Sequence, residues 1–92
     1  MSIRILAERP ELQQRLRADP ARIPDFIEEV LRFDPPVKVA YRLALHDTQL
    51  AGLDIAAGSV MTACLVGANH DPRQFENPEE FDIDRPGLRN HM

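Results

Sequence analysis

Eight prolines divide this 92-residue chain and limit the length of every regular element it can form. Proline suits the first turn of a helix, and the residue that precedes a proline disfavours the helical conformation. Residues Pro10–Arg17 fit a short helix, with proline in the first turn and Leu12 and Leu16 four apart on one face. The pair Asp19-Pro20 then ends it.

A second helix is predicted from Pro24-Asp25 to about Phe33, where Asp34-Pro35-Pro36 terminates it. It is the strongest helix prediction in the chain, because its apolar residues recur at helical spacing. These residues are Ile23, Phe26, Ile27, Val30, Leu31 and Phe33.

After the double proline the spacing of apolar residues changes from that of a helix to that of a strand. Val37, Val39 and Tyr41 alternate with polar or small residues, which places Arg42 on the opposite face of the predicted strand. Turn signals at residues 51–52 and 57–58 bracket a short segment at 53–55, and residues 59–66 form an apolar run predicted as a strand buried on both faces. The prediction is therefore an α+β fold, one domain over residues 1–92, with two short helices, a small antiparallel sheet and an irregular meander.

Composition excludes several function classes. The formal net charge is -4 and no basic cluster stands out, so we expect no nucleic-acid partner. The longest apolar run, Val60–Ala68, is far shorter than a bilayer requires, and the N-terminus shows no signal peptide. We therefore expect no membrane association and a cytoplasmic location.

The residues able to carry chemistry are few. Cys64 is the single cysteine and lies in an apolar stretch, so it is predicted to be an inert core residue. The three histidines lack the spacing of zinc ligands, and no metal site is expected. An exposed turn position is the favoured interpretation for His70. Glu29 and Arg32 lie three apart on the second helix, a spacing that by itself is typical of an exposed ion pair.

Taken together, the sequence blocks resemble part of the bacterial cytochrome P450 family. The stretch Phe26–Val37 is similar to the K helix and the strand entry that follows it, and the preceding Arg9–Pro20 is similar to the approach to that helix. Further blocks in matching order are Arg42-Leu43-Ala44, Asp47–Gly52, Ile55–Gly58, Ala68–Pro72 with Phe75, and Pro78–Pro86.

The resemblance implies a role for four residues. Glu29 and Arg32 match the K-helix pair, and Arg85 matches the arginine that joins them in a buried structural triad. Arg42 matches a residue that commonly pairs with a haem propionate, although a solvated strand arginine is the alternative. The resemblance assigns no catalytic residue to this chain.

The resemblance also implies what to expect of the cofactor. In the family, haem is held by a cysteine loop that follows soon after the stretch matching Arg85–Met92, and this chain ends at Met92. We therefore expect a truncated cytochrome P450 homologue, from a family of haem-thiolate monooxygenases, that binds no haem stably and has no independent activity.

Three hypotheses about its own role stay open. A truncated homologue would expose apolar faces and is expected to form a homo-oligomer. Alternatively, the chain is a binding or regulatory subunit that completes a partner of the same family. A third hypothesis is weak haem or anion binding through Arg42 without catalysis.

Overall fold

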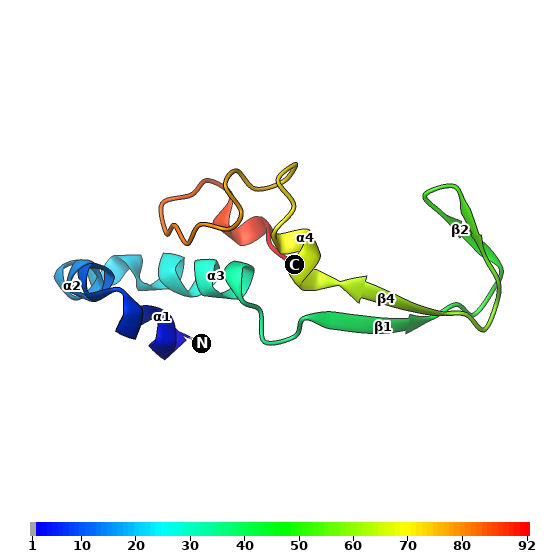
Figure 1. The fold of residues 1–92 in the computed structure, drawn as a ribbon, viewed down its shortest axis with the longest axis horizontal. Helices are drawn as coiled ribbons and strands as arrows, with labels where there is room; N and C mark the ends of the chain where they lie inside the picture. The colour runs from blue at the N-terminus through cyan, green and yellow to red at the C-terminus, as the bar shows by residue number, and fades with distance from the viewer. Residues whose placement is uncertain (1) are drawn as a thin grey trace.

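The computed structural model describes residues 2–92 and shows an elongated molecule of 54 × 23 × 20 Å (Figure 1). The Cα radius of gyration is 17.1 Å, whereas a compact chain of this length has about 12 Å. The helices and the C-terminal meander form one end, here called the body (residues 2–36 and 65–92). A narrow arm (residues 37–64) projects from it.

The helices follow the proline pattern of the sequence. The body contains α1 (Ser2–Glu8), α2 (Pro10–Ala18), α3 (Ile23–Phe33) and α4 (Leu65–Asn69), with 3-10 turns at Pro20–Arg22 and Leu88–Asn90. The two predicted helices are confirmed within a residue or so at each end, as α2 and α3. The sequence did not indicate α1 or α4.

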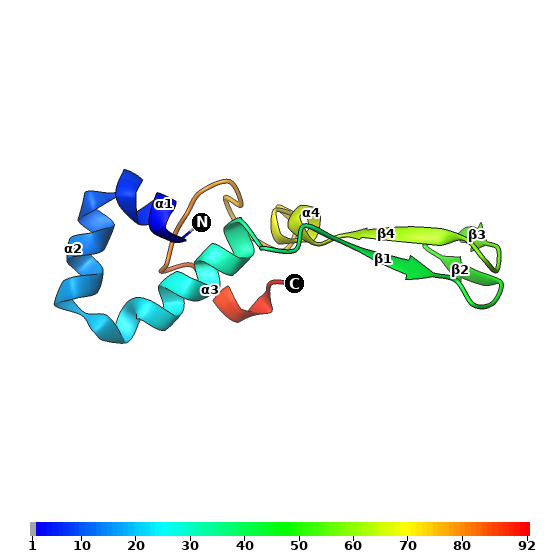
Figure 2. The same ribbon diagram turned by 90° about the horizontal axis from the view of Figure 1, so that it is seen from below.

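The strands form two separate antiparallel pairs rather than one sheet. β1 (Val39–Leu43) pairs with β4 (Val60–Cys64), with Tyr41 opposite Thr62, and β2 (Thr48–Leu50) pairs with β3 (Leu53–Ile55) at the tip of the arm. Figure 2 shows that the arm extends away from the helices along its whole length. The α+β class is therefore confirmed, with more helices than predicted.

Two predictions about the run 59–66 are wrong. The strand ends at Cys64 and a short helix begins at Leu65, and β4 is largely exposed rather than buried on both faces. An apolar run shows that a strand can be buried but does not supply the layers that bury it, and within residues 2–92 no second layer packs over the ribbon. Cys64 is therefore an exposed thiol, not a core residue.

The hydrophobic core lies in the body, between the helices and the meander (residues 70–87). It consists of Ile5, Leu12, Leu16, Phe26, Val30 and Ile83, with Leu6, Phe33 and Phe81 packed against it. Phe81 meets Phe26 and Phe33 edge to face, at ring-centroid distances of 5.8 and 5.7 Å. This core fixes α3 against the meander, which is where the candidate site forms. Within residues 2–92, no helix is long and apolar enough to cross a bilayer.

Candidate functional site: a buried ion cluster and an exposed arginine

The structure brings Glu29, Arg32 and Arg85 together in one cluster, here called the ion cluster. Arg32 Nε donates to one oxygen of the Glu29 carboxylate, and Arg85 Nε donates to the other at 2.7 Å. The side chains of Glu29 and Arg32 are 0% exposed and that of Arg85 is 4% exposed. An exposed helical ion pair, the ordinary interpretation of this spacing, is therefore excluded.

Each remaining guanidinium nitrogen of the two arginines donates to the main chain. Arg32 reaches three carbonyl oxygens, of Asn69, Pro78 and Glu80, at 2.9–3.0 Å. Arg85 reaches three, of Glu76, Asn77 and Glu80, at 2.6–3.1 Å. The two guanidinium groups therefore share one counter-ion and donate six hydrogen bonds to five carbonyl oxygens, that of Glu80 accepting from both. These contacts offset the desolvation penalty of the buried charges.

Local sequence explains why Glu29 faces inward. It lies beside Val30 and three residues after Phe26 on α3, both of them core residues, so the carboxylate points to the meander. Its Oε2 also accepts the Asp82 main-chain N–H at 2.7 Å. The Phe75 ring, 5.5 Å from Arg32 Cζ, covers the cluster from the meander side.

Arg42 lies elsewhere, on the arm. It is exposed on β1 opposite Met61, and its guanidinium donates only to the neighbouring Tyr41 carbonyl, at 2.8 Å. Of the ion pairs formed within the described chain, none includes Arg42. The structure thus does not join Arg42 to the ion cluster, and it leaves its charge available to an anion.

A second ionic contact was not anticipated from the sequence. Asp84 in the meander accepts two hydrogen bonds from Arg15 of α2, at 2.6 and 2.8 Å, and one from Arg22 at 2.8 Å. These hydrogen bonds, above all those from Arg15, lower the pKa of the Asp84 carboxyl below its usual value. Asp84 lies 62 positions after Arg22 and 69 after Arg15, so no local sequence pattern could have predicted these contacts.

The histidines are placed as hydrogen-bonding residues. His70 does not occupy a fully exposed turn, because its ring contacts the Phe33 carbonyl oxygen at 2.8 Å and the Glu79 carboxylate at 3.0 Å. His91 Nε2 lies 2.6 Å from Glu28 Oε2. Over residues 2–92 no group of three or more His, Cys, Asp or Glu side chains is arranged to hold a metal ion.

Comparison with known proteins identifies the family of the chain. The model of the cytochrome P450 family matches residues 1–91. The chain belongs to the cytochrome P450 family. Its similarity to cytochrome P450 144 of Mycobacterium tuberculosis is 44% identity over 88 residues, which cover 96% of this chain and 20% of that protein.

Solved cytochromes P450 contain the same fold segment. The structure of CYP150A6 from Mycobacterium marinum in its substrate-free form superimposes with a TM-score of 0.94 at 53% identity, over 99% of this chain and 22% of that one. CYP109E1 of Bacillus megaterium, solved in complex with testosterone, gives a TM-score of 0.90 at 36% identity and is covered to 25%. The chain thus spans about a fifth of the length of the relatives it matches.

Proposed function

We propose that this chain is a scaffold segment of a haem-thiolate monooxygenase of the cytochrome P450 family and has no oxidative activity of its own. The observation that carries the proposal is the ion cluster. Glu29 is fully buried and both carboxylate oxygens are used by arginines, so it has no free position for a substrate or a proton acceptor. Such a cluster holds α3 to the meander and performs no chemistry.

The Arg42 side chain is suited to bind a propionate of a haem. Its unpaired, exposed guanidinium is the kind of group that binds a propionate carboxylate, with two parallel hydrogen bonds available. Haem bound through a cysteine thiolate supplies the oxygen activation of cytochromes P450. Cys64 is an exposed thiol at the end of β4, opposite Val39 of β1, and the proposal assigns it no ligand role. The chain contributes Arg42 as an anion contact.

The arm is the surface through which the chain meets another polypeptide. Eight of the twelve large apolar residues exposed within the described chain lie on it: Val37, Val39, Tyr41, Leu43, Leu45, Leu50, Leu53 and Val60. Exposed apolar residues gathered on one part of a molecule are typical of an interaction site. We expect separate copies of the chain to associate through it as a homo-oligomer.

The hydrogen-bond pattern of the ribbon supports a specific geometry for that association. Leu65 donates to the Lys38 carbonyl and Ala44 to the Ser59 carbonyl, each at 2.9 Å. Because bonded and non-bonded pairs alternate in antiparallel ribbons, the main-chain groups of residues 60, 62 and 64 face outward from β4. Two copies of β4 related by a two-fold axis at Thr62 would pair all three positions.

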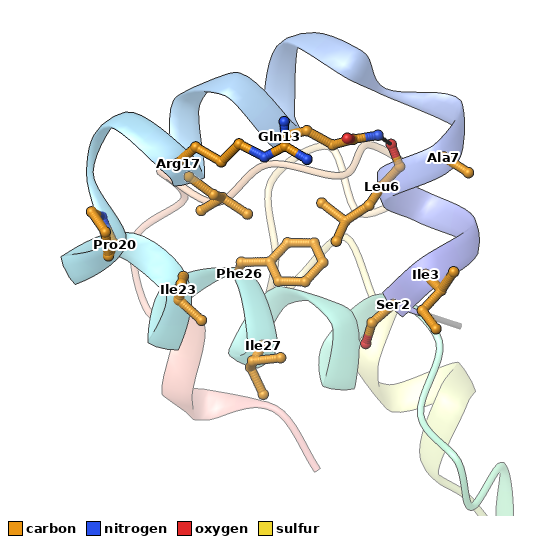
Figure 3. A pocket seen from close by; sticks show the side chains of 11 residues that line it. Ser2, Ile3, Leu6, Ala7, Gln13, Arg17, Pro20, Ile23, Phe26 and Ile27 are labelled. Carbon is orange, nitrogen blue, oxygen red and sulfur yellow. Dashed lines mark hydrogen bonds between the residues drawn. The ribbon is translucent and has the colours of Figure 1, made fainter.

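A second function is favoured by a further apolar surface on the body. Helices α1, α2 and α3 enclose an open groove of about 760 Å³, into which Leu6, Phe26 and Ile27 project (Figure 3). A chain with both an uncovered arm and an uncovered groove suits a subunit that completes a partner of the same family. Co-purification with that partner, lost when the groove residue Ile27 is replaced by aspartate, would favour this function.

Titration with haemin tests the proposed function. We expect weak binding that does not survive gel filtration, and a change in the Soret band that Arg42→Ala removes and the control Arg73→Ala retains, since the Arg73 side chain is 90% exposed in a separate turn. After reduction and addition of carbon monoxide, we expect no band of the thiolate-ligated ferrous type. A thiolate-type band would contradict the proposal, and equal effects of the two variants would remove Arg42 from it.

A further inference from the structure

Among residues 2–92, Asn69 is the one fully buried polar side chain that the ion cluster does not include. It is the last residue of α4 and is 0% exposed, like Glu29 and Arg32. A buried amide without partners destabilises a fold, so the hydrogen bonds of Asn69 show what it holds. Both of them go to one residue, Met92.

The Asn69 amide contacts the main chain of Met92 at two points. Its Oδ1 accepts the Met92 N–H at 2.7 Å, and its Nδ2 donates to the Met92 main-chain oxygen at 3.4 Å. A neighbouring strand would bind a residue in the same two-point way. Met92 lies outside the helices and strands, and its own side chain is largely exposed, so apolar packing does not explain its position.

His91, the residue before Met92, is held by a side chain of α3. His91 Nε2 lies 2.6 Å from Glu28 Oε2, and the two side chains are 14% and 23% exposed. Glu28 directly precedes Glu29 on α3. The Glu29 carboxylate belongs to the ion cluster, and the Glu28 carboxylate contacts His91.

Asn69 is itself fixed by the ion cluster. Its main-chain oxygen accepts a hydrogen bond from Arg32 Nη1 at 3.0 Å. A continuous series of contacts therefore runs from Glu29 through Arg32 and Asn69 to Met92. The position of the main chain at residue 92 is set by α4, and α4 is set by the buried arginine.

We propose that Asn69 is a positioning residue, which together with Glu28 clamps residues 91 and 92 against the body. The inference deepens the proposed scaffold function, since it names the part of the chain that the ion cluster holds in place beyond the meander. It does not depend on haem or on self-association, because every contact in it lies within the body.

Amide hydrogen exchange of Met92, followed by NMR on the full chain, tests the clamp. In the wild type the Met92 amide should exchange at least about fivefold more slowly than its intrinsic rate, as expected of one retained hydrogen bond. Exchange at the intrinsic rate would overturn the proposal without any variant. This result would leave the haem and association experiments unaffected.

Variants at Asn69 then separate positioning from general stability. Asn69→Leu keeps the approximate volume and removes both hydrogen bonds, so protection of Met92 should disappear while the α2 and α3 amides stay protected. Asn69→Asp keeps the acceptor for the Met92 N–H and should retain partial protection.

The matched control is Asn90→Leu, because Asn90 is exposed two residues from Met92. Unchanged protection in Asn69→Leu, or equal loss in the control, would overturn the proposal. If Asn69→Leu does not fold, Met92 protection is compared between Asn69→Asp and the control. Equal protection in these two variants would overturn the proposal.

Discussion

A single carboxylate, that of Glu29, organises the interior of this chain. It accepts hydrogen bonds from two arginines and from the Asp82 main chain. Burial changes how much such a contact contributes to the free energy of unfolding. An exposed pair is worth about 0–1 kcal/mol, whereas removing one member of a buried set costs about 3–5 kcal/mol because the remaining charges lose their counter-ion.

The first residue-scale prediction concerns Glu29→Gln. The change keeps the shape of the side chain and leaves two buried guanidinium groups without a carboxylate, so the free energy of unfolding should fall by about 3–5 kcal/mol. For a domain of this size that lowers the thermal midpoint by more than about 12 °C. Circular dichroism melts would measure it.

Two controls accompany that measurement. Glu79→Gln is the matched change at a carboxylate that is 79% exposed, and Arg73→Ala removes a side chain that is 90% exposed. Both should move the midpoint by only a few degrees. Equal small shifts for all three variants would mean that the ion cluster does not stabilise the fold.

Part of this cluster could be predicted from the sequence and part could not. The spacing of Glu29 and Arg32 on an amphipathic helix indicates that they are neighbours, but not that they are buried. Arg85 lies 56 residues after Glu29, and only the resemblance to a known family connected the two. Asn69 gave no signal at all, because a buried amide that binds the main chain follows no spacing rule.

At the scale of elements, two ionic contacts attach the meander to the helices. The ion cluster joins it to α3, and Asp84 joins it to α2 through Arg15 and to the start of α3 through Arg22. The second attachment is half-exposed, with 50% of the Asp84 side chain and 44% of the Arg15 side chain accessible. Solvent screening therefore makes the contribution of this attachment to stability small. The dependence of stability on pH is the clearest way to detect it.

The prediction at this scale is that Asp84 contributes to acid sensitivity. Its folded-state pKa is lowered by the Arg15 hydrogen bonds, so its contribution to stability is fully present above the ordinary carboxyl value of 3.8 and is lost as pH falls through the lowered value. Unfolding by urea measured from neutral pH to below pH 3.8 should show a smaller acid loss for Asp84→Asn than for the wild type. Asp54→Asn on the arm, where the carboxylate meets only Gln49, is the control. Identical pH profiles for the wild type and Asp84→Asn would contradict the assignment.

Helices were easier to predict than strands for a physical reason. Proline acts locally, so Pro10, Pro20 and the pair Pro35-Pro36 fix the bounds of α2 and α3 without reference to the rest of the molecule. Burial of β4 is not a local property, since it depends on layers that pack over the ribbon. The same apolar stretch reads as a strand through Val66, yet Leu65 and Val66 begin α4.

The whole molecule consists of a body with a hydrophobic core and an arm without one. The body buries an apolar core, whereas the strands of the arm pair only with one another and carry exposed apolar residues. Figure 2 shows the arm projecting from the body. A two-stranded ribbon is marginally stable in water on its own. This is why we propose that a second copy of the chain packs on the arm through β4.

Two proline variants can test which edge of the ribbon is used. Proline at residue 62 removes an N–H that faces away from β1, so it leaves the ribbon paired and blocks the outer edge of β4. Proline at residue 41 does the same for the outer edge of β1. The first substitution acts on the proposed interface and the second is its matched control.

Sedimentation velocity at micromolar concentration is the most direct measurement of this claim. The account predicts a dimer for the wild type, a monomer for Thr62→Pro and a dimer for Tyr41→Pro. A folded wild-type chain that sediments as a monomer, or a dimer that Thr62→Pro leaves intact, would contradict it.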